Sequence, residues 1–126
     1  MSRILLIIIA AYCLILGFVM WFAPQYWYDA TPGVAMMGPF NSHFIRDAGL
    51  AFLTSGGALF YGVLKPNRPL AIFGAMWPCL HAAFHIWIWL ARGIPFDQVA
   101  LVNLVGIQLP AWLALMAAIR LQGDPQ

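Results

Sequence analysis

Four long apolar runs, separated by short polar segments, follow one another along the chain. They cover about residues 4–23, 42–64, 69–91 and 98–120. At a rise of about 1.5 Å per residue, a run of about 20 apolar residues is long enough to cross a bilayer as an α-helix. The pattern therefore predicts an all-α fold, an integral membrane four-helix bundle that forms a single membrane domain over residues 1–126.

Residues that start or stop helices lie at the ends of these runs. Pro24 ends the first run, and Asn41 or Ser42 caps the start of the second. Pro69 lies in the first turn of the third run, where the missing N–H of proline costs nothing. The first run is longer than the apolar part of a signal peptide and lacks a small-x-small cleavage site, so we expect it to remain as a membrane helix.

The segment between the first two helices, residues 25–40, is too polar and too often interrupted by proline and glycine to cross a membrane. Tyr26, Trp27 and Tyr28 are of the type that anchors at the level of the lipid headgroups. We therefore expect an interfacial segment between the first and second helices. A substrate-binding aromatic cage is the alternative role for these side chains.

The composition and the net charge of the chain indicate its surroundings and its partners. Hydrophobic residues make up 63% of the chain and charged residues only 8%, whereas a soluble domain has about 25% charged residues. The lipid bilayer is therefore the expected surrounding. The net charge of +2 is small and no basic run is present, which excludes nucleic acid as a partner. Cys13 and Cys79 lie within apolar runs and are expected to be small core residues.

The positive charges predict the orientation in the membrane. Four of them lie at one set of helix ends and two at the other: Arg3, Lys65, Arg68 and Arg120 against Arg46 and Arg92. Because positive residues gather on the cytoplasmic side, both termini of this multi-pass chain are expected in the cytoplasm. Residues 25–40 and the start of the second helix then face the periplasm or the cell exterior.

Ionisable residues interrupt two of the apolar runs. In the segment PFNSHFIRDAG, His43, Arg46 and Asp47 are spaced i, i+3 and i+4 and share one face of a helix. In CLHAAFHIW, His81 and His85 have the same i, i+4 spacing. Such residues are costly inside a membrane, so a functional role is their default interpretation.

Depth along the helices predicts which of these residues meet. Asp47, His85 and Asn103 each lie about 8 to 9 Å from the outer end of their own helix, at the rise of about 1.5 Å per residue. Three polar side chains from three helices therefore reach one level. We expect Asp47 to face inward, to contact at least one of Arg46, His81, His85 or Asn103, and no histidine to face lipid.

Two prolines are expected to bend the inner parts of the third and fourth helices. Pro78 and Pro110 have no N–H and release the carbonyls of Gly74 and Gly106, four residues earlier. Bends at matched positions can open a small cavity between the helices.

A transition-metal site is the first chemical hypothesis. Two imidazoles one helical turn apart, with a carboxylate from a neighbouring helix, form a set that binds zinc, copper or ferrous iron. The expected metal ligands are His81, His85, Asp47 and His43, and the surrounding polar or cofactor-binding residues are Arg46, Asn103 and Asn41. The expected cofactor is therefore a transition metal (Zn, Cu or Fe) or haem.

Two other roles stay open for the same residues. They can bond to carbonyls and to one another and hold four helices together, or they can form a site for a proton or a small solute. The chain has no glutamate, and Asp29, Asp97 and Asp124 are expected in loops or in the tail. Carboxylate-pair catalysis is therefore poorly supported, and the sequence leaves open whether the protein is an enzyme.

Three functional hypotheses follow. The first is an extracytoplasmic site for a metal ion or a metal-containing cofactor. The second is a non-enzymatic accessory subunit of a larger membrane complex, or a homo-oligomer, because a face of small residues permits close approach by another helix: Ala51, Ser55, Ala58 and Gly62. The third is a small-solute or proton transporter, for which the nearly apolar cytoplasmic halves of the helices offer no polar route.

The runs PGVAMMGPFNSHFIRDAGLAFLTSGG and WPCLHAAFHIW resemble a pattern in a family of small four-span bacterial membrane proteins. In that pattern NxHFxRDxG opens the second helix and HxxxH lies on the third. The likeness covers residues 32–87 and implies a four-helix fold in the bacterial inner membrane. The family's polar positions match His43, Arg46, Asp47, His81 and His85, and the resemblance implies no function. A looser likeness to DoxX-like four-helix membrane proteins extends to architecture only.

Overall fold

The computed structural model describes residues 2–122 and contains no strand within that range. Its elements are α1 (Ser2–Phe22), α2 (Pro24–Ala30), the 3₁₀ turn η1 (Ala35–Met37), α3 (Ser42–Leu64), α4 (Arg68–Ala91), α5 (Gln98–Asn103), the π-helical turn η2 (Leu104–Gln108) and α6 (Leu109–Ile119). Because α5, η2 and α6 form one continuous stretch, four helices are long and apolar enough to cross a membrane. The predicted all-α fold with four long helices is confirmed.

Asparagine side chains start two of the long helices. The side chain of Asn41 accepts hydrogen bonds from the backbone N–H groups of His43 and Phe44, each at 3.1 Å. At the start of α4, Asn67 accepts from the N–H of Leu70 at 3.0 Å. These bonds satisfy donors that the first turn of a helix cannot satisfy itself. Asn41, predicted both as a cap and as a member of the polar cluster, therefore has a structural task at the start of α3.

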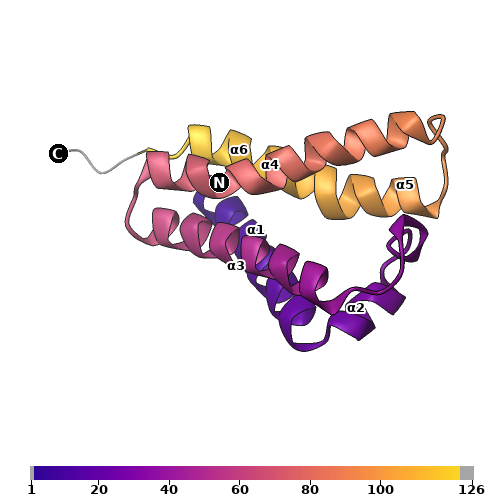
Figure 1. Cartoon of the computed structure of the whole chain (residues 1–126). Helices are drawn as coiled ribbons and strands as arrows, with labels where there is room; N and C mark the ends of the chain where they lie inside the picture. Colours follow the sequence, from indigo (N-terminus) through magenta and orange to yellow (C-terminus); the bar gives the residue numbers. More distant parts are fainter. Residues whose placement is uncertain (1, 123–126) are drawn as a thin grey trace.

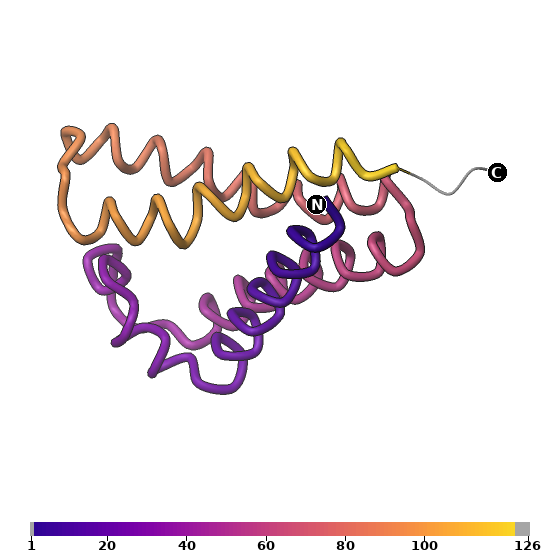
Figure 2. Tube along the Cα trace, turned by 180° about the vertical axis from the view of Figure 1, so that it is seen from behind, coloured from indigo at the N-terminus to yellow at the C-terminus, as the bar shows by residue number. Residues whose placement is uncertain are grey.

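The long helices form two layers that cross and then separate. α1 packs along α3, and α4 packs along both α3 and α6 (Figure 1). From the front and from behind, the layer of α1 and α3 diverges from the layer of α4 and α5 toward the end that carries α2 (Figure 2). Polar groups on the outer halves of α3 and α4 are therefore held apart.

Glycines let α1 and α3 approach closely. A Cβ atom on Gly56 would lie 3.0 Å from the carbonyl oxygen of Ala10 and 2.8 Å from the Cγ of Leu14. A Cβ on Gly17 would lie 2.8 Å from the carbonyl oxygen of Gly49. The backbones of the two helices are thus in contact, which is what small residues at a helix interface permit.

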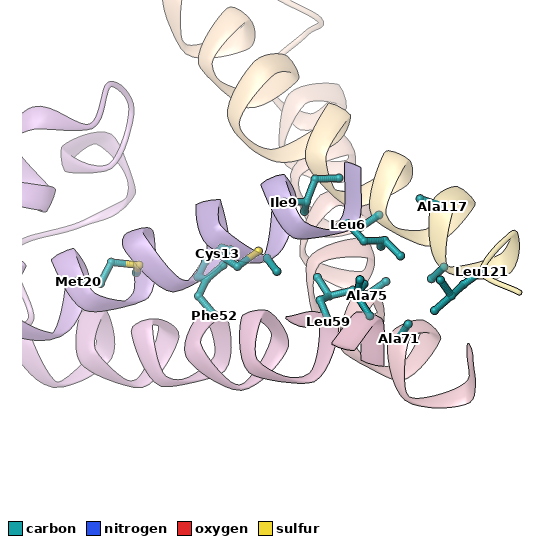
Figure 3. Close-up of a cluster of buried hydrophobic side chains, with 14 of the residues drawn as sticks. Leu6, Ile9, Cys13, Met20, Phe52, Leu59, Ala71, Ala75, Ala117 and Leu121 are labelled. Carbon is teal, nitrogen blue, oxygen red and sulfur yellow. The ribbon is translucent and has the colours of Figure 1, made fainter. Parts of the chain in front are cut away.

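The apolar core lies where α1, α3, α4 and α6 meet (Figure 3). Leu6, Cys13, Met20 and Leu59 are its largest fully buried side chains, each at most 2% exposed. Cys13 and Cys79 are both buried and unpaired, as expected for small core residues. The same crossing region positions the histidines of α4.

Candidate functional site

His81 and His85 form a pair on successive turns of α4. Their ring centroids lie 4.5 Å apart, with an angle of 62° between the planes. Both side chains are half-buried. Aromatic rings surround them: Trp77 stacks on His81 at 5.4 Å, and Phe52 of α3 meets the same imidazole edge-on at 5.9 Å. The pair therefore has a mostly apolar environment.

A small cavity lies between the four long helices beside His81. It has a volume of about 10 Å³, and Tyr12, Phe52, Pro78, His81 and Gly106 are among the residues that line it. A volume of about 10–15 Å³ is what one water molecule requires. Pro78 and Pro110 both lie at this cavity, which matches the prediction that the two prolines open a space between helices.

Tyr12 connects α1 to the irregular part of the fourth helical stretch. Its hydroxyl donates a hydrogen bond of 2.7 Å to the carbonyl oxygen of Gly106, within the π-helical turn η2. Pro110, four residues after Gly106, has no N–H with which to make the ordinary helical bond. Tyr12 takes the place of that missing donor, and so the carbonyl that the sequence marked as released has a partner on α1.

Asn103 and Gln108 tie α4 to the fourth helical stretch. The amide of Asn103 donates to the backbone carbonyl of His85 at 3.4 Å, and the amide of Gln108 donates to the carbonyl of Ala82 at 2.9 Å and to the side-chain oxygen of Asn103 at 3.1 Å. The indole of Trp112 donates to Gln108 at 3.0 Å. Asn103 therefore contacts the backbone of His85, so its role is to hold two helices together.

The polar residues of α3 lie apart from the histidine pair. Nδ1 of His43 is 3.0 Å from Oδ2 of Asp47, and the two side chains are 86% and 61% exposed. Arg46 donates through Nε to the carbonyl oxygen of Trp21 at 3.1 Å, at the end of α1. Asp47, expected to face inward and to contact Arg46, His81, His85 or Asn103, is instead exposed and pairs with His43.

The four predicted metal ligands thus occur as two separate pairs. Within residues 2–122, no group of three or more histidine, cysteine or aspartate side chains comes together in a way that could hold a metal ion. The physical reason is the divergence of the two layers (Figure 1). Asp47 and His85 lie at a similar depth along their own helices. Because the layer of α3 diverges from the layer of α4, this similar depth does not bring their side chains together (Figure 1).

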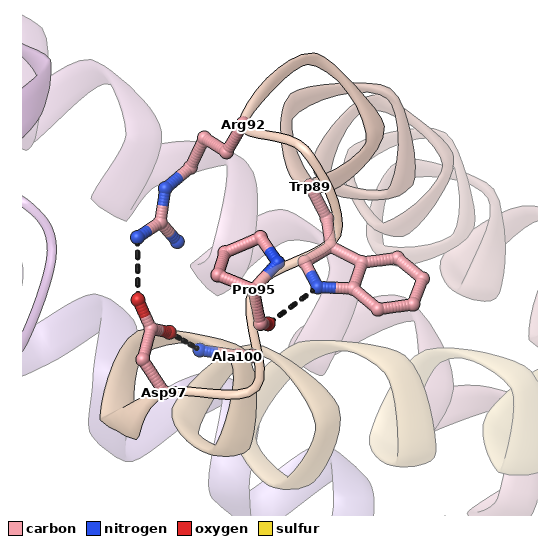
Figure 4. A network of polar contacts seen from close by, with 5 residues as sticks. All are labelled: Trp89, Arg92, Pro95, Asp97 and Ala100. Carbon is pink, nitrogen blue, oxygen red and sulfur yellow. Dashed lines mark hydrogen bonds and ion pairs between the residues drawn. The ribbon is translucent and has the colours of Figure 1, made fainter.

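An ion pair and two hydrogen bonds hold the loop between α4 and α5 (Figure 4). Arg92 and Asp97 form an ion pair at 2.6 Å, and the indole of Trp89 donates to the carbonyl of Pro95 at 2.9 Å. The carboxylate of Asp97 also accepts from the N–H of Ala100 at 2.8 Å and caps α5. The Ala100 hydrogen bond first, and then the hydrogen bond from Arg92, hold the pKa of Asp97 below its ordinary value.

Three residues of the polar framework were absent from the sequence predictions: Tyr12, Gln108 and Trp112. Each is one polar group in an otherwise apolar run, which carries no spacing pattern. The released carbonyl of Gly106 was the one signal that pointed toward a donor from another helix. Comparison of the chain with protein families, with curated proteins and with solved structures finds no match. The resemblance to small four-span membrane proteins therefore stays a prediction.

Proposed function

We propose that this is an integral membrane protein that binds a transition-metal ion, or a metal-containing cofactor, through His81 and His85. The spacing of the two imidazoles is the observation that carries the proposal. With metal–nitrogen bonds of about 2.0–2.1 Å, a shared ion lies roughly 3 Å from each ring centre, and two neighbouring imidazole ligands have centres roughly 4.5–5 Å apart. The separation of 4.5 Å between His81 and His85 falls in this range.

The two histidines supply only part of a coordination sphere. Imidazole nitrogen suits zinc, copper, iron and nickel, and water or a substrate would complete the remaining positions, as at metal sites that keep an open position for chemistry. Asp47 and His43 are no part of this proposal, because they pair with each other at the exposed start of α3. A haem iron would be held through the imidazole of one of the two histidines.

Lipid is the environment proposed for the outer faces of the helices. Many large apolar side chains there are exposed, among them Phe18, Phe22, Phe73 and Trp87, which are 50% to 77% exposed. A bilayer covers such a surface at no cost. We place the chain in the bacterial inner membrane with both termini in the cytoplasm, because four of the six positive residues lie at that end. The metal site then opens toward the periplasmic half.

The accessory-subunit hypothesis has less support. The small-residue face of α3 was expected to receive another chain, yet Cβ atoms at Gly62 and Gly74 would lie 3.0 Å from Ala71 and Ala58, so this face packs against α4. Purification in a mild detergent tests the hypothesis independently. A stoichiometric partner that copurifies would favour the accessory role, and a metal-loaded protein without a partner would favour the metal site.

Metal content of the purified protein tests the proposed function. We expect wild-type protein in mild detergent to carry a transition metal, or to take up one equivalent when Zn²⁺ or Cu⁺ is supplied, and the His81→Ala, His85→Ala double variant to carry none. His43→Ala is the matched control, because it removes the exposed histidine of α3, and it should keep the metal. An optical spectrum separates haem from a colourless ion. Equal metal content in wild type and in the double variant would refute the proposal.

A further inference from the structure

A groove lies between the start of α1 and the end of α6. Both views of the chain place the start of α1 beside α6 (Figure 1, Figure 2), and Leu6 and Ala117 are buried in the core where these helices meet (Figure 3). The groove has a volume of about 270 Å³. Pockets that enclose a drug-sized ligand have about 300–1,000 Å³, so this groove has room for part of a larger molecule.

The lining of the groove changes from polar to apolar along both helices. On α1 the terminal residue Ser2 is polar, and Ile4 and Leu5 follow it. On the other side Arg120 directly follows the last residue of α6, and apolar lining residues extend back to Leu113. At a rise of about 1.5 Å per residue, Leu113 lies about 10 Å from Arg120 along the helix. A matching ligand therefore has a polar group at the helix ends and an apolar part that extends toward the middle of the helices.

The charges at this end of the molecule indicate the sign of that polar group. Four positive residues lie here at the ends of long helices: Arg3, Lys65, Arg68 and Arg120. Asp29, Asp47 and Asp97 lie at the opposite end, with α2 and the loop between α4 and α5 (Figure 1). The two ion pairs within residues 2–122 are those of Asp47 and Asp97, so no carboxylate of this range neutralises Arg120. The groove therefore suits an anion, and a guanidinium binds phosphate through two parallel hydrogen bonds.

An anionic phospholipid has the same arrangement of charge and apolar chain. In the proposed orientation this end of the helices faces the cytoplasm, where the leaflet carries anionic lipids and where basic pockets between membrane helices bind their headgroups. A second copy of the chain is a poorer match. In a two-fold dimer the same patch of both copies meets, so a dimer through this groove would bring one Arg120 close to the other.

We propose that the groove between α1 and α6 binds an anionic phospholipid, with the phosphate at Arg120 and an acyl chain along Leu113 and Met116. The inference rests on the proposed placement of the chain in a bilayer and goes beyond the proposed metal site, which it does not involve. The bound lipid contacts the first and the last long helix together. Because a ligand that binds the native state stabilises it, the lipid raises the melting temperature of the protein.

Binding of dioctanoyl phosphatidylglycerol to the full chain in mild detergent, followed by native mass spectrometry, tests the role of the charge. Arg120→Gln should lower the affinity about 10- to 100-fold, the effect of losing a hydrogen bond to a charged group. Arg68→Gln is the matched control, because it removes the same charge at the start of α4, outside the groove. It should lower the affinity less than about fivefold. Equal losses in the two variants would overturn the proposal, since they would show only a general attraction to the positive end.

A second variant tests the apolar part of the groove. Met116 is 46% exposed, so Met116→Trp narrows the groove and should keep the melting temperature of the lipid-free protein. Its affinity for dioctanoyl phosphatidylglycerol should fall about 5- to 100-fold, the cost of overpacking. Glycerol phosphate, which has the charge without the acyl chains, should bind wild type more weakly than the lipid does. Unchanged affinity in Met116→Trp, or equal affinity for glycerol phosphate, would overturn the proposal.

Two comparisons distinguish the lipid from other occupants and from the metal site. Wild type should bind phosphatidylglycerol more tightly than dioctanoyl phosphatidylcholine, whose headgroup has no net charge, and equal affinities would contradict an anion site. A lipid-free wild-type dimer that Met116→Trp dissociates would also overturn the proposal, because a second copy would then occupy the groove. All lipid measurements use protein without added metal. Failure of lipid binding therefore leaves the metal site standing, and a protein without metal leaves the lipid result unchanged.

Discussion

His81 meets Phe52 edge-on, with ring centroids 5.9 Å apart and an angle of 84° between the rings. This contact joins α4 to α3. On one side of it the helices pack through Gly62, Gly74 and alanines. His85 lies one turn farther along α4, toward its C-terminal end. The histidine pair therefore follows the close-packed part of α4 in the direction of its C-terminal end.

The close approach of α1 and α3 predicts that added volume at Gly56 is destabilising. A Cβ there would lie 3.0 Å from backbone atoms of Ala10 and Leu14, and overpacking of this kind costs about 1–3 kcal/mol. Gly57 is the neighbouring control, with nothing within 4 Å of its Cβ position, and Gly57→Ala should be neutral or stabilise by up to about 1 kcal/mol. Thermal unfolding in detergent measures both. Equal melting temperatures for the two variants would contradict the packing of α1 on α3.

The loop between α4 and α5 predicts that Asp97 matters more for stability than Asp47. Asp97 caps α5 and pairs with Arg92, whereas Asp47 pairs with His43 at an exposed position. The Asp97→Ala variant should therefore melt at a lower temperature than Asp47→Ala. An inward-facing Asp47 would give the opposite order of melting temperatures. A larger loss for Asp47→Ala would mean that its carboxylate faces a partner inside the bundle after all.

Asp97 also predicts a dependence of stability on pH. Its pKa lies below the ordinary 3.8, chiefly because of the Ala100 hydrogen bond and then because of the hydrogen bond from Arg92. A carboxyl group with a lowered folded-state pKa stabilises the fold above its unfolded pKa, and that contribution disappears as the pH falls through the folded value. The melting temperatures of wild type and Asp97→Asn should therefore differ at neutral pH and converge in acid. A constant difference at every pH would exclude Asp97 as the source.

The polar network around Gln108 predicts a further effect on stability. Gln108→Ala removes the partner of the Ala82 carbonyl, of the Asn103 side chain and of the Trp112 indole. Hydrogen bonds between membrane helices contribute about 0.6–2 kcal/mol, so a loss of about 1–2 kcal/mol is expected. Gln25→Ala is the control, since Gln25 bonds to Asp29 on the exposed surface of α2. If both variants unfold alike, the network does not hold α4 to the fourth helical stretch.

The helices could be predicted from the sequence because their causes are local. Apolar length marked the four long helices, Asn41 was named as a possible cap, and Pro110 marked the carbonyl of Gly106. The i, i+4 spacing alone brought His81 and His85 together, since both lie on one helix. Each of these features depends on residues within a few positions of one another.

The relations between helices could not be predicted in the same way. Counting residues placed Asp47 and His85 at the same depth, but depth says nothing of the lateral distance between two helices that diverge. The partner of Gly106 is Tyr12, 94 positions away in sequence. A single hydroxyl in an apolar run gives no pattern to detect, and its partner became identifiable only when α1 was placed against η2.

X-ray absorption at the edge of the bound metal tests the central claim most directly. If His81 and His85 bind one ion, the spectrum of the metal-loaded protein contains two imidazole ligands per ion, with nitrogen at about 2.0–2.1 Å. The His85→Ala variant should lose one of them, and His43→Ala should leave the spectrum unchanged. Metal-loaded protein without imidazole scattering, or with the same spectrum in the His81→Ala, His85→Ala double variant, would contradict the proposed metal site.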